Sequence, residues 1–325
     1  MPIISIIIPC YNLGSYLDGC LNSISHQEVG EVEYIFVNDG STDRTLDKIQ
    51  KFCRGKESYC RIINQSNSGV SNARNAALKL CKGEYLYMLD GDDLLTESAI
   101  KEMLRAIKIS HADMIISNAL ILNASGEETL LKLPIQSGKY TPEEFFKKIK
   151  VFPTIPKNLY RTEIVKKHTL CFDNKLKFGE VYEFTLRFLC FSKNIFVSDS
   201  CYFKYIMCAQ SASHAPDYSK DISILDTLKK YNEIKGDFSN QPSYKITMFK
   251  MLMAFSYNKY AKLKLINKSA TDNIYQIHHD PNVSKLCKDV FALKSTPVKE
   301  RLLALYFYLT GVQGYKLLVR ILNLK

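Results

Sequence analysis

The sequence predicts an α/β protein in which a mostly parallel sheet is covered by helices on both faces, followed by a helical C-terminal region. Through the first 120 residues, short runs rich in Ile, Val, Tyr and Phe alternate with stretches of helical periodicity. The connections are short, as in parallel sheets whose crossovers are helices. From about residue 218 onward the pattern is mainly helical and rich in Lys, Leu and Tyr.

The alternation defines five strands and four helices. The first strand, ISIIIP, is a continuous apolar run, which is typical of a strand buried on both faces. We expect the strands at residues 4–9, 31–40, 61–65, 84–90 and 112–119. We expect the helices at residues 13–27, 41–53, 68–83 and 96–110, with Gly83 as the C-terminal stop of the third.

The charge is distributed unevenly along the chain. Residues 1–200 carry 25 Lys and Arg against 24 Asp and Glu, whereas residues 201–325 carry 19 against 9. We therefore predict a domain at residues 1–217, with halves at about 1–120 and 121–217, and a basic helical region at 218–325. Such a basic region suits an anionic membrane surface or nucleic acid. Because the sequence has no zinc-finger or RNA-binding signature, we favour lipid and expect no nucleic-acid partner.

The cysteines and the N-terminal sequence indicate in which cellular compartment the protein is expected. The ten cysteines are scattered and none form a CxxC pair, which argues against zinc. The N-terminal sequence MPIISIIIPCYN has neither a basic lead nor a cleavage site, so we expect no signal peptide. The cysteines are then most simply reduced thiols of a cytoplasmic protein.

Polar segments follow four of the expected strands. They are PCYN, NDGSTD, NQSNSG and DGDD, at residues 9–12, 38–43, 64–69 and 90–93. Ligands of parallel α/β sheets bind beyond the carboxyl ends of the strands, so we expect these segments to form one site. Taken singly, each residue has an ordinary alternative. Asp39 can be a turn residue, Arg74 a surface arginine of a helix, and Tyr11 a loop-packing residue.

The DGDD segment crowds three carboxylates, and two interpretations are open. Asp90 and Asp92, separated by Gly91, suit a Mg²⁺ or Mn²⁺ ion that also contacts a diphosphate. Alternatively, Asp92 or Asp93 caps a helix that begins near Leu94. The phosphate-binding patterns GxxxxGK[ST] and GxGxxG are absent, so a nucleotide here would be held by acids and a metal.

Three segments together carry a family resemblance. SIIIPCYNLGSYLDGCLNSISHQ, EYIFVNDGSTDRT and NSGVSNARNAALKLCKGEYLYMLDGDDLL closely resemble successive signatures of the family 2 glycosyltransferases, which have the GT-A fold. The resemblance is strong over about residues 3–118 and fainter to about 214. It implies an inverting hexosyl- or N-acetylhexosaminyl-transferase that uses a nucleotide-sugar donor, most simply a UDP-sugar, with Mn²⁺ or Mg²⁺.

The resemblance also implies which residues bind the donor. Pro9, Tyr11 and Asp39 would hold the uracil, and Asn38 replaces the first acid of the family's DDGS turn. The implied nucleotide-binding residues are Pro9, Tyr11, Asn12, Asp39, Gly40, Ser41, Asn67, Gly69, Arg74, Asp90 and Gly91.

Within that set, the resemblance places Arg74 near the nucleotide and Asp90 on the ribose. Asp92 is the implied metal ligand, and Asp93 is a supporting or capping residue. His214 occupies the position where some family members supply a late histidine to the metal or diphosphate, and its alternative is a solvated loop histidine.

The expected catalytic base is replaced in this chain. LKFGEVYEFTLRFL resembles the family stretch Gly-Glu-Asp-x-x-Phe, with Gly179, Glu180 and Phe184 in register, and Val181 stands where the family has its base. An inverting transferase needs a base that takes the proton of the acceptor hydroxyl. Glu180 or Glu183 can substitute, and the alternative is that both are solvated helix acids.

The C-terminal segment ERLLALYFYLTGVQGYKLLVRILNLK has an uncharged stretch from Leu302 to Tyr315 with basic residues on either side. This stretch is too short to span a bilayer, which requires about 20 apolar residues. Aromatic residues beside basic ones suit a helix that lies in the membrane interface. The alternative is a helix that packs on the catalytic domain or on the partner of a homodimer.

These observations predict a cytoplasmic glycosyltransferase that is peripheral at the inner face of the plasma membrane. By resemblance, the acceptor is a lipid-linked glycan of a bacterial capsule, lipopolysaccharide or exopolysaccharide pathway. A rival hypothesis is a catalytically silent nucleotide-sugar-binding subunit that supports a partner transferase, with Val181 as its evidence. A nucleotidyltransferase would usually have a basic glycine-rich loop after the first strand, which PCYNLGSYL does not provide.

Overall fold

The computed structural model describes residues 1–27, 30–123, 125–149, 157–176, 179–206 and 279–292, together with residues 230, 234, 244, 245, 248, 249, 304 and 309. The chain divides into two compact units. The first comprises Met1–Pro142, Pro153–Asn174 and Arg187–Ala215. The second comprises Glu143–Phe152, Lys175–Leu186 and Pro216–Lys325.

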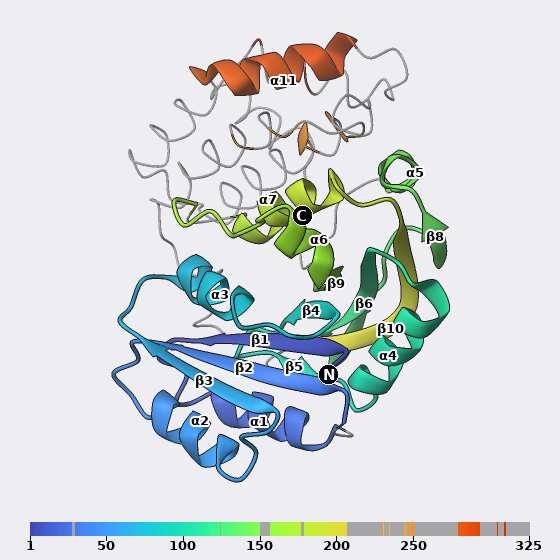
Figure 1. The fold of residues 1–325 in the computed structure, drawn as a ribbon. Helices are drawn as coiled ribbons and strands as arrows, with labels where there is room; N and C mark the ends of the chain where they lie inside the picture. Colours follow the sequence, from blue (N-terminus) through green and yellow to red (C-terminus); the bar gives the residue numbers. More distant parts are fainter. Residues whose placement is uncertain are drawn as a thin grey trace. The chain divides into compact units, whose positions relative to one another are not determined.

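One sheet with the strand order β3-β2-β1-β4-β9-β6-β10-β5 forms the centre of the first unit (Figure 1). Its first four strands are parallel neighbours: β1 (Ile4–Cys10), β2 (Val32–Asp39), β3 (Cys60–Gln65) and β4 (Tyr85–Met88). Their carboxyl ends therefore meet at one edge of the sheet, as the sequence predicts.

The second half of the sheet is mixed. β6 (Met114–Leu122) and β10 (Ile195–Ile206) are parallel to each other. β9 (Asn158–Arg161) lies between β4 and β6 and is antiparallel to both. The short strands β5 (Leu94–Leu95), β7 (Glu128–Leu131) and β8 (Gly138–Tyr140) add antiparallel pairs. The α/β class is confirmed, and the antiparallel strands are additions that periodicity does not predict.

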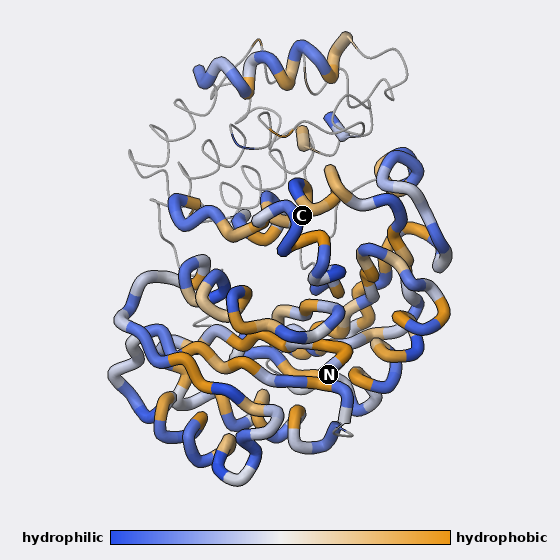
Figure 2. The backbone as a smooth tube through the Cα atoms, in the orientation of Figure 1, coloured by the Kyte–Doolittle hydropathy of each residue, from blue (hydrophilic) through white to orange (hydrophobic). Residues whose placement is uncertain are grey.

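Helices cover both faces of the parallel half. α1 (Leu17–Ser25) and α2 (Thr45–Cys53) lie on one face and α3 (Val70–Leu78) lies on the other (Figure 1). Every residue of β1 is buried, which explains its continuous apolar sequence. The strands accordingly run as a hydrophobic layer inside a more hydrophilic exterior (Figure 2).

One predicted helix end and the helix start assumed by the capping alternative are wrong. Gly83 does not stop α3, which ends at Leu78. A Cβ on Gly83 would lie 2.5 Å from the backbone nitrogen of Ser5, so this glycine permits close approach to β1. The helix expected at residues 96–110 is α4 (Ala99–Ser110). It does not begin near Leu94, as the capping alternative requires, because Leu94 and Leu95 pair with β10.

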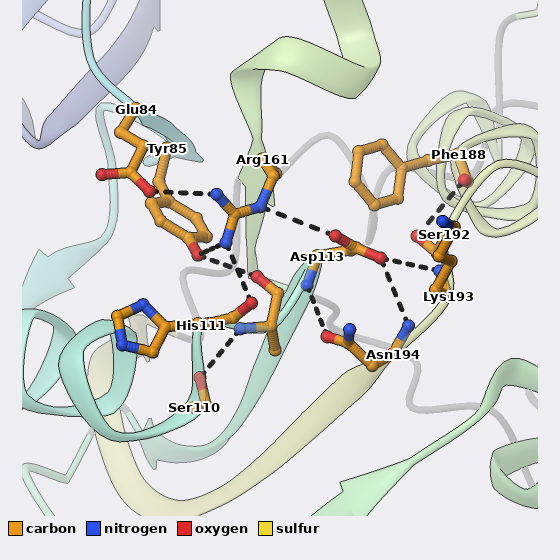
Figure 3. A network of polar contacts seen from close by, with 11 residues as sticks. Glu84, Tyr85, Ser110, His111, Asp113, Arg161, Phe188, Ser192, Lys193 and Asn194 are labelled. Carbon is orange, nitrogen blue, oxygen red and sulfur yellow. Dashed lines mark hydrogen bonds and ion pairs between the residues drawn. The ribbon is translucent and has the colours of Figure 1, made fainter.

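A polar network at the far end of β9 fixes that strand in the sheet (Figure 3). The Arg161 guanidinium donates to Tyr85 Oη at 2.7 Å, to Glu84 Oε1 at 3.0 Å and to the His111 carbonyl at 2.9 Å. Arg161 also pairs with Asp113 at 3.5 Å. α6 (Thr162–Lys167) follows directly. β9 is therefore anchored to both of its neighbouring strands.

The described part of the second unit is helical. It contains most of α5 (Pro142–Lys148) and α7 (Glu180–Leu189), and all of α11 (Pro281–Ala292). Phe146 packs edge-on against Tyr244, and Lys245 pairs with Asp289 on α11 at 2.8 Å. The predicted interfacial helix at 300–325 lies almost entirely outside the described residues. Among the helices that the structure describes, none is long and apolar enough to cross a membrane.

Candidate functional site

The loops after β1 and β2 are joined by hydrogen bonds. Asn12 has a left-handed backbone with φ 52°, a conformation that asparagine tolerates better than most residues. Its backbone N–H donates to Ser41 Oγ at 3.0 Å, and its side-chain oxygen accepts from the Thr42 N–H at 2.9 Å. Tyr11, one residue earlier, is 49% exposed and presents an aromatic surface at the strand ends.

Asp39, at the end of β2, organises the loop between β3 and α3. Its Oδ1 accepts from Gln65 Nε2 at 2.7 Å and from the Ser68 N–H at 3.0 Å. Its Oδ2 accepts from the Gly69 N–H at 2.8 Å. The side chain is only 3% exposed, so these bonds satisfy a buried carboxylate.

Gly40 makes room for the same loop. It has φ +72°, and a Cβ there would lie 2.5 Å from the backbone nitrogen of Asn67. Any other residue would therefore strain its own backbone and displace the loop. Asn38 is buried and donates to the side-chain oxygen of Asn64 at 2.7 Å, so it links the ends of β2 and β3.

Two cations hold Asp90, which follows β4. Arg74 on α3 donates to Asp90 Oδ1 at 2.9 Å, and the Lys157 ammonium lies 2.5 Å from Asp90 Oδ2. Lys157 also pairs with Asp93 at 3.0 Å. The Arg74 and Lys157 side chains are nearly buried, whereas Asp90 is 38% exposed. The site therefore combines paired, desolvated cations with a carboxylate that solvent reaches.

Asp93 does not cap a helix. It is 2% exposed, its N–H donates to the Asp90 carbonyl at 3.0 Å, and its Oδ1 accepts from the Ile206 N–H at 3.4 Å. The capping interpretation is therefore wrong. Asp93 is instead the buried partner of Lys157, at the point where the chain turns from β4 toward β5.

Asp92 is the remaining acid, and it is half-buried. Its carboxylate accepts no hydrogen bond from any other residue that the structure describes. Gly91 places it: a Cβ on Gly91 would lie 2.7 Å from Leu13 Cδ1 and 3.4 Å from the Pro9 carbonyl oxygen. A side chain at position 91 would displace the Leu13 side chain, so glycine lets this turn pack closely on the end of β1.

The electrostatics of the three acids differ. Burial favours the neutral form of Asp90, but Lys157 and Arg74 outweigh it and hold its pKa well below the usual range. Burial raises the pKa of Asp93 to about 6, an effect that Lys157 only partly offsets. Burial and the nearby Asp90 charge also raise the pKa of Asp92. The Asp90 and Asp93 charges keep Lys157 cationic by raising its pKa.

The first unit thus brings together most residues of the sequence-predicted site. Glu180 and Glu183 lie in the first turn of α7 and belong to the second unit. Glu180 is half-buried, and Glu183 is 4% exposed. His214 lies outside the described residues.

Lys157 is the residue that sequence reasoning missed. It precedes a strand of four residues in a proline-containing stretch, where no periodicity was visible. The usable signal was the run NLYR directly after a lone lysine, since a short strand there would carry Lys157 to a sheet edge.

Fold and site together define an α/β protein with a charged ligand site beyond the carboxyl ends of parallel strands. Residues 5–169, just over half of the chain, match the family described as glycosyl transferase family 2. The chain belongs to this family of sugar-transferring enzymes. The family predicted from the sequence is confirmed.

Curated relatives include bacterial glycosyltransferases. The chain is 27% identical over 193 residues to the uncharacterized glycosyltransferase EpsJ of Bacillus subtilis, which is 57% of this chain and 56% of EpsJ. It is 26% identical over 212 residues to the poly(ribitol-phosphate) beta-N-acetylglucosaminyltransferase TarS of Staphylococcus aureus, which is 61% of this chain and 35% of TarS. The chain therefore spans less than two thirds of either relative.

Solved structures share the fold. S. aureus TarS 1-349 in complex with UDP has a TM-score of 0.72 at 22% identity, covering 99% of this chain and 91% of that one. Its complex with UDP-GlcNAc has a TM-score of 0.75 at 21% identity, covering 99% and 92%. The mannosyltransferase PcManGT of Pyrobaculum calidifontis, in complex with GDP-Man and Mn²⁺, has a TM-score of 0.55 at 12% identity, covering 99% and 87%. The predicted GT-A fold is confirmed.

Proposed function

We propose that the protein transfers a hexosyl or N-acetylhexosaminyl group from a UDP-linked donor to a glycan acceptor, with inversion. The observation that carries this proposal is the set of strand-end groups: exposed Tyr11, the loop held by Asp39, the Arg74–Asp90–Lys157 cluster and the half-buried Asp92. Family membership and the UDP and UDP-GlcNAc complexes of TarS support it.

The donor is held by residues of the first unit. Tyr11 offers its ring face to the uracil. Three of the described donors to Asp39 share Oδ1, namely Gln65 Nε2, the Ser68 N–H and Ser68 Oγ, and only the Gly69 N–H is bonded to Oδ2. Because a carboxylate oxygen has two lone pairs, Oδ2 keeps one position for the imide N–H of the base. Asp90, fixed by Arg74 and Lys157, accepts from the ribose hydroxyls.

The donor atoms of the site fit Mn²⁺ or Mg²⁺. No group of three or more His, Cys, Asp and Glu side chains that could hold a metal occurs among the described residues, so this part of the protein is not a self-sufficient metal cage. Mg²⁺-type ions bind through one or two carboxylates and complete their shell with phosphate oxygens and water. Asp92 would be the ligand that the first unit supplies. The ion would neutralise the diphosphate as it leaves.

Transfer with inversion requires a base on the acceptor side. Val181 cannot accept a proton, and Glu180 and Glu183 are the acids in the same helical turn. We favour Glu180, because it is only half-buried, whereas Glu183 is 4% exposed. The acceptor is a lipid-linked glycan of cell-surface polysaccharide synthesis.

A second candidate function is a catalytically silent subunit that binds a nucleotide sugar for a partner transferase. Val181 favours it, since the position has no proton acceptor. This candidate predicts the same donor affinity as the enzyme, without turnover.

We also propose that the protein is cytoplasmic and peripheral at an anionic membrane. Residues 201–325 carry 19 Lys and Arg against 9 Asp and Glu. Each basic residue near such a surface contributes about 1 kcal/mol, and salt screens this attraction. Sedimentation with phosphatidylserine vesicles at low salt tests it, and protein that stays in the supernatant contradicts it.

The deciding experiment incubates the protein with a panel of UDP-sugars and Mn²⁺ and measures UDP release, with EDTA as the control. Metal-dependent UDP release from one donor supports the enzyme. UDP binding without release, in the presence of lipid-linked acceptors, supports the silent subunit. Absence of UDP binding with Mn²⁺ overturns both.

A further inference from the structure

Lys157 is a buried lysine between two of the three acids. Its side chain is 7% exposed and lies 2.5 Å from Asp90 Oδ2 and 3.0 Å from Asp93 Oδ2. Its ammonium also lies 5.5 Å from the centre of the Phe203 ring, within the range of a cation–π contact. Lys157 is therefore a desolvated ammonium group that forms ion pairs with two carboxylates.

The topology of β9 explains how Lys157 arrives there. β9 is antiparallel to β4, and Tyr85 pairs with Arg161 while Tyr87 pairs with Leu159. The residue before β9 therefore lies beside the carboxyl end of β4, where Asp90 begins the acidic turn. Arg161 fixes the opposite end of β9 through the network in Figure 3. Lys157 is thus held in place by the sheet.

The ion pairs of Lys157 determine which of the three carboxylates is available to bind a cation. Asp90 and Asp93 flank Asp92 closely in the chain, and carboxylate oxygens are the ligands that a hard cation prefers. Here Asp90 forms ion pairs with Lys157 and Arg74, and Asp93 forms an ion pair with Lys157. Asp92 is the one member of the trio with no ion pair among the described residues. One carboxylate alone is a weak site.

We propose that Lys157 is a positioning residue that withholds Asp90 and Asp93 from the divalent cation, so that the cation binds tightly only together with the donor diphosphate. Phosphate oxygens then complete a shell that Asp92 begins. Metal and donor affinities are coupled, and the coupling is reciprocal. This inference rests on the proposed function and adds to it the reason why metal and nucleotide bind together.

The test is Lys157→Met, which preserves much of the side-chain length and removes the charge. Two affinities are measured by calorimetry: Mn²⁺ alone, and UDP in saturating Mn²⁺. We expect Mn²⁺ alone to bind about tenfold or more tighter, because Asp93 is released and Asp90 keeps only Arg74. We expect UDP to bind about tenfold or more weaker, because Asp90 has lost a positioning partner. A merely structural role would weaken both.

Lys166→Met is the matched control. Lys166 donates to the Cys81 carbonyl at 2.9 Å. This variant also loses a lysine from the first unit, and both affinities should stay at the wild-type level. If Lys157→Met does not fold, the double variant Lys157→Met/Asp93→Asn removes both members of the buried pair. It should fold and still bind UDP about tenfold more weakly, because Asp90 keeps only Arg74.

The outcomes separate the inference from the proposed function. Wild-type protein that fails to bind UDP with Mn²⁺ contradicts the proposed function. Wild-type binding of UDP, combined with an unchanged or reduced Mn²⁺ affinity in Lys157→Met, overturns the inference alone. If the double variant binds UDP with the same affinity as the wild-type protein, the inference is overturned as well.

Discussion

The Asp39 carboxylate and the Gly69 backbone N–H form a hydrogen bond of 2.8 Å that joins the end of β2 to the residue before α3. Through this bond and those to Gln65 and Ser68, one buried acid shapes the loop from which α3 begins. α3 carries Arg74, the partner of Asp90. Asp39 therefore influences the acidic turn from a different strand.

Asp39→Asn should lower both stability and UDP affinity. An amide has one acceptor oxygen, so at least one of the N–H groups now bound by the carboxylate loses its partner. An unsatisfied buried group costs about 1–3 kcal/mol. We expect that loss in denaturant unfolding, and about a tenfold loss of UDP affinity by calorimetry. Asp47→Asn is the control, an exposed acid on α2 that should leave both quantities unchanged.

Asp92→Asn should remove the metal dependence of UDP binding. Asp92 is the acid that the ion pairs leave available, so its loss should reduce UDP affinity in Mn²⁺ to the value measured in EDTA. Because Asp92 is only half-buried, the free energy of unfolding should change little. An Asp92→Asn protein that still gains UDP affinity from Mn²⁺ would show that another group binds the ion.

Asp93→Asn is the complementary variant. It removes a buried partner of Lys157, and breaking such a pair costs about 3–5 kcal/mol when no partner remains. Lys157 retains Asp90, so we expect a loss near the lower end of that range in denaturant unfolding. The gain in UDP affinity from Mn²⁺ should persist. An Asp93→Asn protein with the same free energy of unfolding as the wild type would contradict the buried ion pair between Asp93 and Lys157.

Sequence reasoning succeeded where the structure is local and periodic. The alternation of β1–β4 with α1–α3 follows from residue patterns within single segments, and parallel pairing then brings the strand ends together. It failed where distant segments meet. Leu94 and Leu95 form a strand because Phe203 and Lys204 pair with them, and nothing near residue 94 indicates that pairing.

The same limit explains the missed lysine. Lys157 reaches Asp90 only because β9 inserts antiparallel between β4 and β6, a strand order that short-range patterns do not encode. Gly83 was misassigned for a related reason. Glycine is needed at position 83 because a Cβ there would collide with Ser5 on β1, and not because a helix ends there.

Arg161→Met should destabilise the first unit without removing any group of the acidic turn. The side chain is 20% exposed and donates to a phenol, a carboxylate and a carbonyl. Hydrogen bonds to charged groups contribute about 1.5–3 kcal/mol each, and partial exposure reduces this, so we expect a total loss of about 2–3 kcal/mol. Arg105→Met, which removes a 72% exposed arginine from α4, should change stability by less than about 0.5 kcal/mol.

Cysteine labelling should follow burial. Burial raises the pKa of Cys81 to about 12, so this thiol stays protonated at pH 8, and the side chain is inaccessible. Cys171 is exposed. Iodoacetamide at pH 8, followed by peptide mass mapping, should modify Cys171 in the native protein and Cys81 only after unfolding. Native labelling of Cys81 would contradict the burial of this thiol in the segment between α3 and β4.

The identity of the base decides between an enzyme and a silent subunit. A positioned base contributes about 10²–10⁴-fold in rate, so Glu180→Gln should reduce turnover by that order while UDP affinity stays at the wild-type value. Glu183→Gln is the matched variant in the same turn of α7, and its main effect should be on stability because Glu183 is buried. If both variants transfer sugar at the wild-type rate, neither glutamate is the base. Val181→Asp restores an acid at the position that the family resemblance assigns to the base. An inactive wild type that gains transfer activity through Val181→Asp would identify the chain as a donor-binding subunit, whereas an active wild type that depends on Glu180 identifies an enzyme whose base has moved by one residue.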